Sequence, residues 1–133
     1  MTLRISSTLL ERLIAEAQAS SDEICGLLFG TMEEIQHTLP CSNVAPHPET
    51  GFELDPAELI AAHKAERAGG PKIIGCYHSH PTGTASPSPR DAAAAAEDGS
   101  IWLILAGTAA SAWRSGETGE HEGRFAPVAL IAG

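Results

Sequence analysis

Cysteine is scarce in this sequence, and the few cysteines present follow no paired pattern. Cys25, Cys41 and Cys76 cannot all pair with one another, and none belongs to a C-x-x-C motif. A disulfide framework is therefore not expected. Because no charged-then-apolar leader precedes the domain either, we expect reduced thiols and a cytoplasmic protein.

Positive charge is also in short supply. Eight Lys and Arg residues stand against 17 Asp and Glu residues, which gives a formal net charge of −9. Such a chain repels phosphate backbones and anionic lipids, so neither a nucleic acid nor a membrane is an expected partner. Long hydrophobic runs are absent as well. The longest, residues 101–107, is far shorter than the ~20 residues that a membrane span requires.

What the sequence does contain is enough for one compact domain. Its 133 residues can bury one substantial core but are too few for two. No internal repeat, low-complexity tail or long linker interrupts them, so we expect a single domain over residues 1–133. Strand-like and helix-like segments are interleaved, which favours an α/β fold with a mixed β-sheet flanked by helices in three layers.

The first half of the chain gives clear signals of secondary structure. Residues 3–5 resemble a short edge strand, and residues 6–19 an amphipathic helix. Thr8 and Glu11 could form a capping box, so the start of this helix is open by about one turn. Residues 23–30 form a nearly continuous apolar run, which is typical of a central strand that is covered on both faces.

The second half begins with the clearest helix start in the chain. Asp55, Pro56 and Glu58 supply an N-cap, a first-turn proline and an N3 acid. We expect this helix to bury Leu59, Ile60 and Ala62 and to end at the Gly-Gly-Pro of residues 69–71. The other expected strands cover residues 35–41, 72–77, 101–106, 109–114 and 125–132.

Two histidines separated by one residue follow the strand predicted at residues 72–77. On a strand, His78 and His80 point to the same face, roughly 6.6 Å apart along the backbone. Imidazoles with this spacing can converge on one metal ion, about 2.0–2.1 Å from each nitrogen. Pro81 then ends the strand, because it has no N–H for the ladder.

A third candidate ligand begins the next helix. Ser88 is placed at its N-cap, Pro89 at its first position and Asp91 at N3, and alanines follow. The helix dipole favours the ionised form of a carboxylate in the first turn. Two histidines, one carboxylate and an open fourth position are typical of a catalytic zinc site.

Hydrolysis at such a site also needs a group that takes up a proton and returns it to the leaving nitrogen. Glu23 is favoured for this task because it opens the strand expected to be central, where its position would be rigid. Spacing alone does not choose among the candidates, which are Asp22, Glu23, Glu33, Glu34, Glu49, Glu53 and Glu58.

Taken together, these motifs resemble those of the JAMM (MPN+) metalloprotease family. The resemblance rests on Glu23-x-Cys-Gly-Leu-Leu, on His78-Ser-His80-Pro and on Pro-Ser88-x-x-Asp91, with the spacing His-x-His-x10-Asp. Residues 52–56 also look like a segment of small bacterial members, so the resemblance covers nearly the whole chain. It implies that His78, His80 and Asp91 bind Zn²⁺, that Glu23 is the general acid/base and that Ser88 stabilises the oxyanion.

The same resemblance carries expectations about fold and substrate. It implies a fold similar to that of cytidine deaminases. It also implies cleavage after the C-terminal Gly-Gly of a ubiquitin-like protein, and small bacterial members that look like this chain act on sulfur-carrier proteins of that kind. The segment from residue 102 onward holds no cysteine and only His121, so a second metal site is not expected.

Several alternatives stay open from the sequence. The chain could be a non-catalytic MPN-type scaffold that binds other proteins, and Ser88 could be a plain helix cap. A nucleoside deaminase is excluded because P-C-x-x-C is missing: Pro40-Cys41 is not followed by a second cysteine at residue 44, and His63-Lys64-Ala65 does not match H-x-E. The substrate's identity, the bond type and the oligomeric state are not determined. Cys76 is expected to pack in the core, Trp113 to cover the core or line a groove, and four single histidines to be solvated: His37, His47, His63 and His121.

Overall fold

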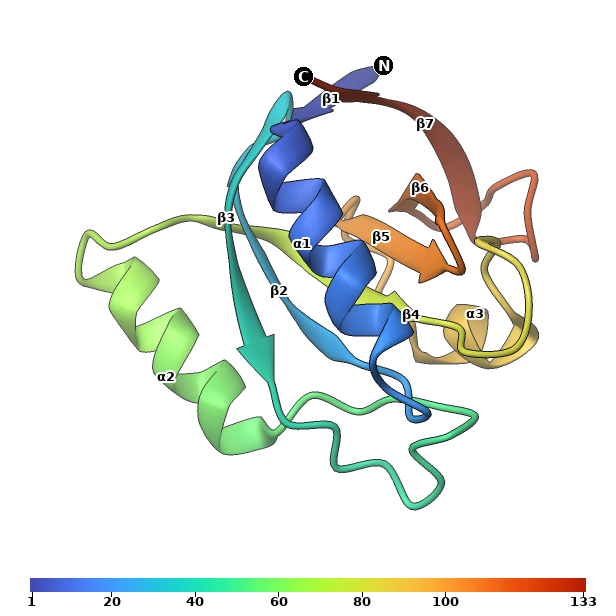
Figure 1. The fold of residues 1–133 in the computed structure, drawn as a ribbon. Helices are drawn as coiled ribbons and strands as arrows, with labels where there is room; N and C mark the ends of the chain where they lie inside the picture. Colours follow the sequence, from blue (N-terminus) through green and yellow to red (C-terminus); the bar gives the residue numbers. More distant parts are fainter.

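Seven strands and three helices make up the fold in the computed structural model, which describes residues 1–133. The strands pair in the order β1-β3-β2-β4-β5-β6-β7, and β7 pairs with β1 (Figure 1). The α/β composition and the single mixed sheet agree with the prediction. In chain order the elements are β1 (Thr2–Ile5), α1 (Ser7–Gln18), β2 (Cys25–Thr31), β3 (Glu34–Cys41), α2 (Pro56–Arg67), β4 (Ile73–Ser79), α3 (Pro89–Ala94), β5 (Ile101–Ala106), β6 (Ala109–Ser115) and β7 (Phe125–Ala132).

The short strand β1 closes the sheet into a barrel. It pairs in parallel with β7 over residues 2–5 and with β3 at Arg4 and Ile5. The prediction of an edge strand at residues 3–5 is therefore wrong, because both sides of β1 are paired. The three-layer arrangement is not confirmed, since a sheet that closes on itself does not form a flat middle layer.

Helices cover both faces of the curved sheet. The largest core cluster joins buried residues of α1, such as Leu13, to residues of all seven strands, including Leu28, Tyr77 and Leu103. Alternate strand residues point to the opposite face. There, Leu27 and its neighbours pack against α2, and a third cluster lies against α3. In Figure 1, α1 lies across the concave side of the sheet and α2 stands outside it.

Strand β4 lies in the middle of the strand order, antiparallel to β2 and parallel to β5. Nearly all of its residues are buried. Cys76 packs with Trp102 and Phe125 in the cluster next to α3, which agrees with the expectation of a packed thiol. Because Cys76 and His78 are two residues apart, this is also the face from which the candidate site is built.

The first helix begins one residue after Ser6. The Ser6 hydroxyl accepts a hydrogen bond from the Leu9 amide at 3.1 Å and so caps α1. The alternative start, a capping box of Thr8 and Glu11, is wrong because both residues lie inside the helix. Propensity does not separate these starts, since Ser and Thr are both good caps.

The second helix begins as predicted at Asp55. The Asp55 carboxylate accepts a hydrogen bond from the Ala57 amide at 2.9 Å, and Pro56 occupies the first turn. Ala62 is buried against β2, as expected. Ile60 is not: it is 55% exposed, because it faces away from the sheet.

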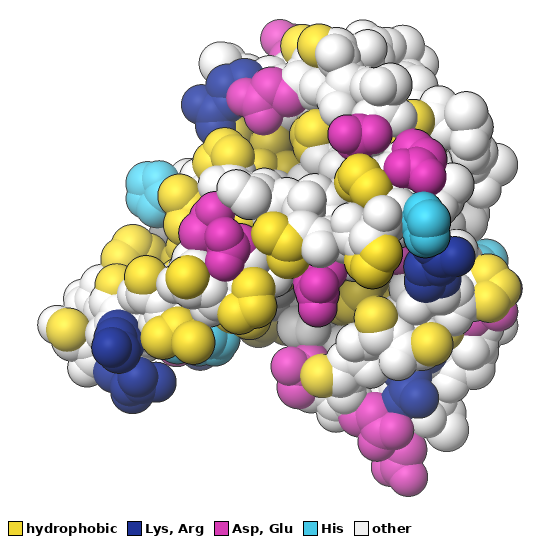
Figure 2. Space-filling view, turned by 90° about the horizontal axis from the view of Figure 1, so that it is seen from below, with side chains coloured by type: hydrophobic (Ala, Val, Ile, Leu, Met, Phe, Trp, Pro, Cys, Tyr) yellow, Lys and Arg dark blue, Asp and Glu magenta, His cyan; other side chains and the backbone are white.

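The surface reflects the acidic composition. On the face that Figure 2 shows, the Lys and Arg side chains lie apart from one another, with acidic side chains between them. No helix in the structure has the length and apolar character needed to cross a bilayer.

Candidate metal centre

The end of β4 presents the two histidines of the His-x-His motif, and the residue between them is tied to Ile24, which directly precedes β2. The Ser79 hydroxyl accepts a hydrogen bond from the Ile24 amide at 2.9 Å, and the Ser79 amide donates to the Ile24 carbonyl at 3.1 Å. On the other side, the His80 amide donates to the Leu105 carbonyl of β5 at 2.8 Å. The strand end is thus held by both neighbours, which limits where the two rings can point.

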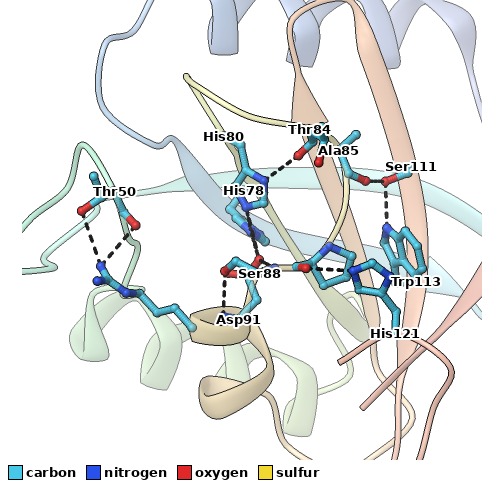
Figure 3. A network of polar contacts seen from close by, with 12 residues as sticks. Thr50, His78, His80, Thr84, Ala85, Ser88, Asp91, Ser111, Trp113 and His121 are labelled. Atoms are coloured by element: carbon cyan, nitrogen blue, oxygen red, sulfur yellow. Dashed lines mark hydrogen bonds and ion pairs between the residues drawn. The ribbon is translucent and has the colours of Figure 1, made fainter. Parts of the chain in front are cut away.

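Asp91 reaches the same place from the first turn of α3. The Ser88 hydroxyl accepts a hydrogen bond from the Asp91 amide at 3.1 Å, and the Ser88 amide donates to Asp91 Oδ2 at 2.9 Å. This reciprocal pair is a capping box, in agreement with the predicted helix start. It turns the carboxylate back toward the end of β4 (Figure 3).

Three side-chain atoms therefore meet between β4 and α3. His78 Nε2 and His80 Nε2 are 3.1 Å apart, and Asp91 Oδ2 lies 3.1 Å from the first and 3.2 Å from the second. Ligand atoms arranged tetrahedrally around zinc, each about 2.0–2.1 Å from the ion, would be about 3.3 Å from one another. The three predicted ligand atoms stand close to the separation that a shared zinc ion requires.

Hydrogen bonds alone do not satisfy this group. His80 Nδ1 is 2.7 Å from the Thr84 carbonyl, which can only accept, so the His80 ring donates from Nδ1 and a neutral ring turns the lone pair of Nε2 toward Asp91. A carboxylate has no proton to offer in return. His78 Nδ1 is buried without a partner, so the second ring is not fully satisfied either. A cation bound between the side chains would satisfy the lone pairs of His80 Nε2 and Asp91 Oδ2, and the donor set suits zinc.

The charge states of His78 and Asp91 also suit a metal. Burial lowers the pKa of His78 and keeps its ring neutral, the form that binds metals. Burial acts to raise the pKa of Asp91, but the hydrogen bonds to His78 and His80 outweigh it and hold that pKa well below its usual range. His80 differs, because burial acts to lower its pKa but the hydrogen bond that its protonated ring gives to Asp91 outweighs burial and leaves that pKa raised. A cation bound at His80 Nε2 would displace that proton.

Glu23 stands beside this group without joining it through a hydrogen bond. One oxygen of its carboxylate and ring nitrogens of His78 and His80 lie within 4.8 Å of one another, a cluster that could hold a metal ion. Glu23 is buried, and its Oε1 has no hydrogen-bond partner. Burial raises the pKa of this carboxyl to about 7, although the nearby His80 acts to lower it.

The rigidity of Glu23 has a different origin from the one predicted. It does not open β2, which starts at Cys25. Instead, its amide donates to the Pro48 carbonyl at 2.7 Å, and its carbonyl accepts from Asn43 Nδ2 at 2.9 Å. The loop of residues 42–55 therefore fixes the backbone of Glu23 from outside the sheet.

Comparison with known families agrees with this geometry. The model of the family described as prokaryotic homologs of the JAB domain matches residues 6–116, a span that contains all five predicted site residues. The chain belongs to this family. It is a small prokaryotic member of the JAMM/MPN group, as the sequence motifs indicated.

Relatives within the JAMM/MPN group differ in how much of their length they share with this chain. A desampylase from Haloferax volcanii is 38% identical over 84 residues, which are 62% of this chain and 60% of the relative. A probable TtuB-protein conjugate cleaving protease from Thermus thermophilus is 42% identical over 64 residues, which are 48% of this chain and 43% of the relative. The matches thus span less than two thirds of either relative.

A solved structure shares the fold over nearly the full chain. A protein from Desulfitobacterium hafniense superposes with a TM-score of 0.80, covering 99% of this chain and 93% of that one. Its sequence identity is 23%, so the likeness concerns the fold.

A cleft of about 480 Å³ opens in front of the three predicted ligands. His78 and Asp91 lie buried behind it, whereas Glu23, His80 and Ser88 reach its wall. No large hydrophobic side chain lines it. The lining residues are Glu23, Glu49, Thr50, His80, Pro81, Thr82, Gly83, Thr84, Ser86, Pro87, Ser88 and His121.

Sequence reasoning missed three residues that support the site. Asn43 binds the backbone of Glu23, and Phe52 stacks on the ring of His78. His121, expected to be an isolated solvated residue, lines the cleft and contacts the Pro87 carbonyl at 3.0 Å. Phe52 lies in the segment of residues 52–56 that resembles the family, but the resemblance gives it no role. No local pattern marks Asn43 or His121, because their partners are far away in the sequence.

Proposed function

We propose that this protein is a zinc-dependent peptidase or isopeptidase that cleaves after the C-terminal Gly-Gly of a ubiquitin-like or sulfur-carrier protein. The observation that carries the proposal is the convergence of His78, His80 and Asp91 next to the unpartnered carboxylate of Glu23. The names of the two relatives, a desampylase and a probable protease of TtuB-protein conjugates, support this class of substrate.

In this proposal, His78, His80 and Asp91 are the zinc ligands. Their three atoms are already within 3.1 to 3.2 Å of one another, so little rearrangement would accompany binding. The hydrogen bond from His80 Nδ1 to Thr84 and the Ser88 amide bond to Asp91 orient two of them. Zinc held there would supply a Lewis acid that polarises the scissile carbonyl and lowers the pKa of water to about 7.

Glu23 is assigned to proton transfer. Its carboxylate lies near the two histidines but forms no ion pair with either, which leaves room for a water molecule between them. A pKa raised by burial to about 7 is close to the optimum for a group that must both accept and return a proton near neutral pH. We assign Glu23 to take the proton of the attacking water and to deliver it to the leaving nitrogen.

Ser88 is assigned to the oxyanion. Its oxygen is engaged as an acceptor from the Asp91 amide, so its O–H remains available as a donor. It lies on the cleft wall with Glu23 and His80, where a substrate carbonyl would be held. A donor placed there strengthens as negative charge develops in the transition state. The cap and the oxyanion role are therefore compatible.

The shape of the cleft suits a glycine-rich tail. Its walls consist mainly of threonines, serines, prolines and Gly83. Two histidines and the acidic Glu23 and Glu49 complete them. Such walls offer polar groups to a peptide backbone and no apolar pocket for a large side chain. A Gly-Gly tail presents backbone alone, and this is the type of ligand that the cleft favours.

A cleavage assay with defined substrates tests the proposal. Ubiquitin-like carrier proteins that bear a C-terminal peptide extension, or a lysine-linked conjugate, would be incubated with the enzyme and followed by intact mass. We expect products that end at Gly-Gly, loss of cleavage after chelation and recovery with Zn²⁺. Peptide and isopeptide substrates in parallel would establish the bond type.

Two variants separate catalysis from binding. Glu23→Gln should abolish measurable turnover while zinc binding is retained, because Glu23 is not a ligand in this proposal. Glu49→Gln is the matched control, since it removes a carboxylate from the same cleft at an exposed position. Wild-type turnover in Glu23→Gln would remove Glu23 from the mechanism. A pure protein that binds neither zinc nor substrate tails would favour the non-catalytic scaffold.

A further inference from the structure

The loop that joins β4 to α3 lacks backbone–backbone hydrogen bonds over nearly its whole length. Residues 81–88 join His80 to the N-cap of α3, and no backbone–backbone hydrogen bond involves residues 81–87. Side chains bind the loop carbonyls instead. These contacts are His80 Nδ1 with the Thr84 carbonyl, the Ser111 hydroxyl with the Ala85 carbonyl, and His121 Nε2 with the Pro87 carbonyl.

We infer that His121 is a positioning residue for this site. Through the Pro87–Ser88 peptide, it fixes both the Ser88 hydroxyl and the Asp91 carboxylate. The inference rests on the proposed function and extends it to a residue that the family match does not reach, since that match ends at residue 116. Figure 3 shows His121 on the side of Ser88 that faces β6.

One peptide plane connects His121 to the ligand atoms. The Pro87 carbonyl accepts from His121 Nε2 at 3.0 Å, and the Ser88 amide in the same peptide donates to Asp91 Oδ2 at 2.9 Å. Because a peptide bond is planar, the direction of its carbonyl determines the direction of its N–H. Asp91 Oδ2 is also the oxygen that contacts both histidines of the site. A rotation of this peptide would therefore move the carboxylate away from them.

His121 is itself held firmly in the connection between β6 and β7. Its amide donates to the Phe125 carbonyl at 3.0 Å, and its carbonyl accepts from the Arg124 and Phe125 amides. Its ring lies 5.0 Å from the Trp113 ring, and Trp113 Nε1 donates to the Ser111 hydroxyl at 2.8 Å. The anchors at Ala85 and Pro87 thus belong to one connected group, so the loop is fastened to β6 as a unit.

The chemistry of the contact indicates which substitutions are informative. A carbonyl can only accept, so His121 must donate from Nε2. The substitution His121→Phe keeps an aromatic ring against Trp113 and removes the hydrogen-bond donor. His121→Gln places a side-chain amide N–H about as far from the backbone as Nε2. In His121→Asn the side chain is too short to reach the Pro87 carbonyl. His63→Phe, on the exposed side of α2, is the matched control.

Zinc affinity and turnover should respond together. We expect His121→Phe and His121→Asn to weaken Zn²⁺ binding, measured by competition with a chelator, by about 10- to 100-fold, the usual effect of losing a contact that orients a metal ligand. With saturating Zn²⁺, kcat should fall by about the same factor while KM changes little, because the other eleven residues of the cleft wall remain. His121→Gln should restore most of both, and His63→Phe should match wild type.

Hydrogen exchange on metal-free protein gives a readout that is independent of activity. In His121→Phe, the peptide that contains residues 81–91 should exchange faster than in wild type, with the exchange of β5 unchanged. Equal zinc affinity and equal exchange in wild type and His121→Phe would overturn the inference. If wild type cleaves no Gly-Gly substrate while the zinc and exchange differences hold, the proposed substrate fails and the role of His121 stands.

Discussion

The ring of Phe52 stacks on the imidazole of His78, with centroids 4.2 Å apart and planes inclined by 17°. Trp102 meets the same imidazole edge-on at 5.5 Å. His78 is therefore enclosed by two aromatic rings in addition to its place on β4. Since its Nδ1 has no hydrogen-bond partner, this packing and the contact of Nε2 with Asp91 fix the orientation of the ring.

Phe52→Ala should loosen His78 and weaken zinc binding. Stacked aromatic pairs contribute about 0.5–1.5 kcal/mol beyond the area they bury. Without the stack, the His78 ring would have to be ordered when zinc binds, and this would lower the affinity of the protein for zinc. We expect zinc affinity to fall about 10-fold. Competition with a chelator measures this. Phe29→Ala, in the cluster under α2, should lower the free energy of unfolding and leave zinc affinity unchanged; an equal loss of affinity there would contradict the stacking explanation.

Asn43→Ala should impair turnover without affecting the metal. Asn43 Nδ2 donates to the Glu23 carbonyl at 2.9 Å and to the Gly51 carbonyl at 3.0 Å, and its Oδ1 accepts from the Ala45 and Glu53 amides at 3.1 Å. Its loss should cost about 2 kcal/mol of stability and about 10-fold in kcat, because Glu23 would be held less well. Kinetics and chelator competition on one sample measure both. Weaker zinc binding would show that Asn43 acts on the ligands instead.

Ser88→Ala separates capping from catalysis when it is compared with Ser6→Ala. Each hydroxyl accepts a hydrogen bond at 3.1 Å from the amide three residues on, so each variant should lose about 1 kcal/mol of stability. Only Ser88→Ala should lower kcat, by about 10²- to 10³-fold, as expected for a lost oxyanion donor. Thermal unfolding and steady-state kinetics provide the data. Near-normal turnover in Ser88→Ala would leave Ser88 as a cap alone.

The stability of the metal-free protein should depend on pH through Glu23. Its pKa is about 7 in the folded protein and near 4.5 when exposed, so the folded state binds the extra proton between these values. Stability is then fully present below about pH 4.5 and falls as the pH rises to about 7. Relative to wild type, Glu23→Gln should gain about 2–3 kcal/mol at pH 8 and almost nothing at pH 4. Denaturant titrations at both pH values, in the presence of chelator, decide this; a gain of equal size at both would exclude titration of Glu23 as the cause.

The parts of the site that were predictable lie within short stretches of sequence. His78 and His80 share a face because strand side chains alternate, and Ser88 and Asp91 form a capping box because of their spacing. The strands at 101–106 and 125–132 agree with the prediction at both ends. Each of these features depends on neighbouring residues, which is why the sequence pattern was sufficient.

The features that escaped prediction depend on distant pairings. The strand at residues 3–5 looked like an edge because its length gives no sign of a second partner, and only the pairing with β7 shows otherwise. His121 lies 34 residues from its partner Pro87, and Asn43 lies 20 from Glu23. Ile60 has the hydrophobicity of a core residue, but the position of α2 leaves it exposed.

The closure of the sheet by β1 has a practical consequence. The first and last strands lie side by side, with Thr2 opposite Ala129 and Ile5 opposite Ala132, and both termini lie at the same end of the molecule (Figure 1). Strand β4, which bears the histidines, is on the other side of the strand order. A short peptide joining the two ends would therefore yield circular permutants, opened at an exposed turn such as residues 69–70, in which the end of the barrel that carries the predicted ligands is left intact.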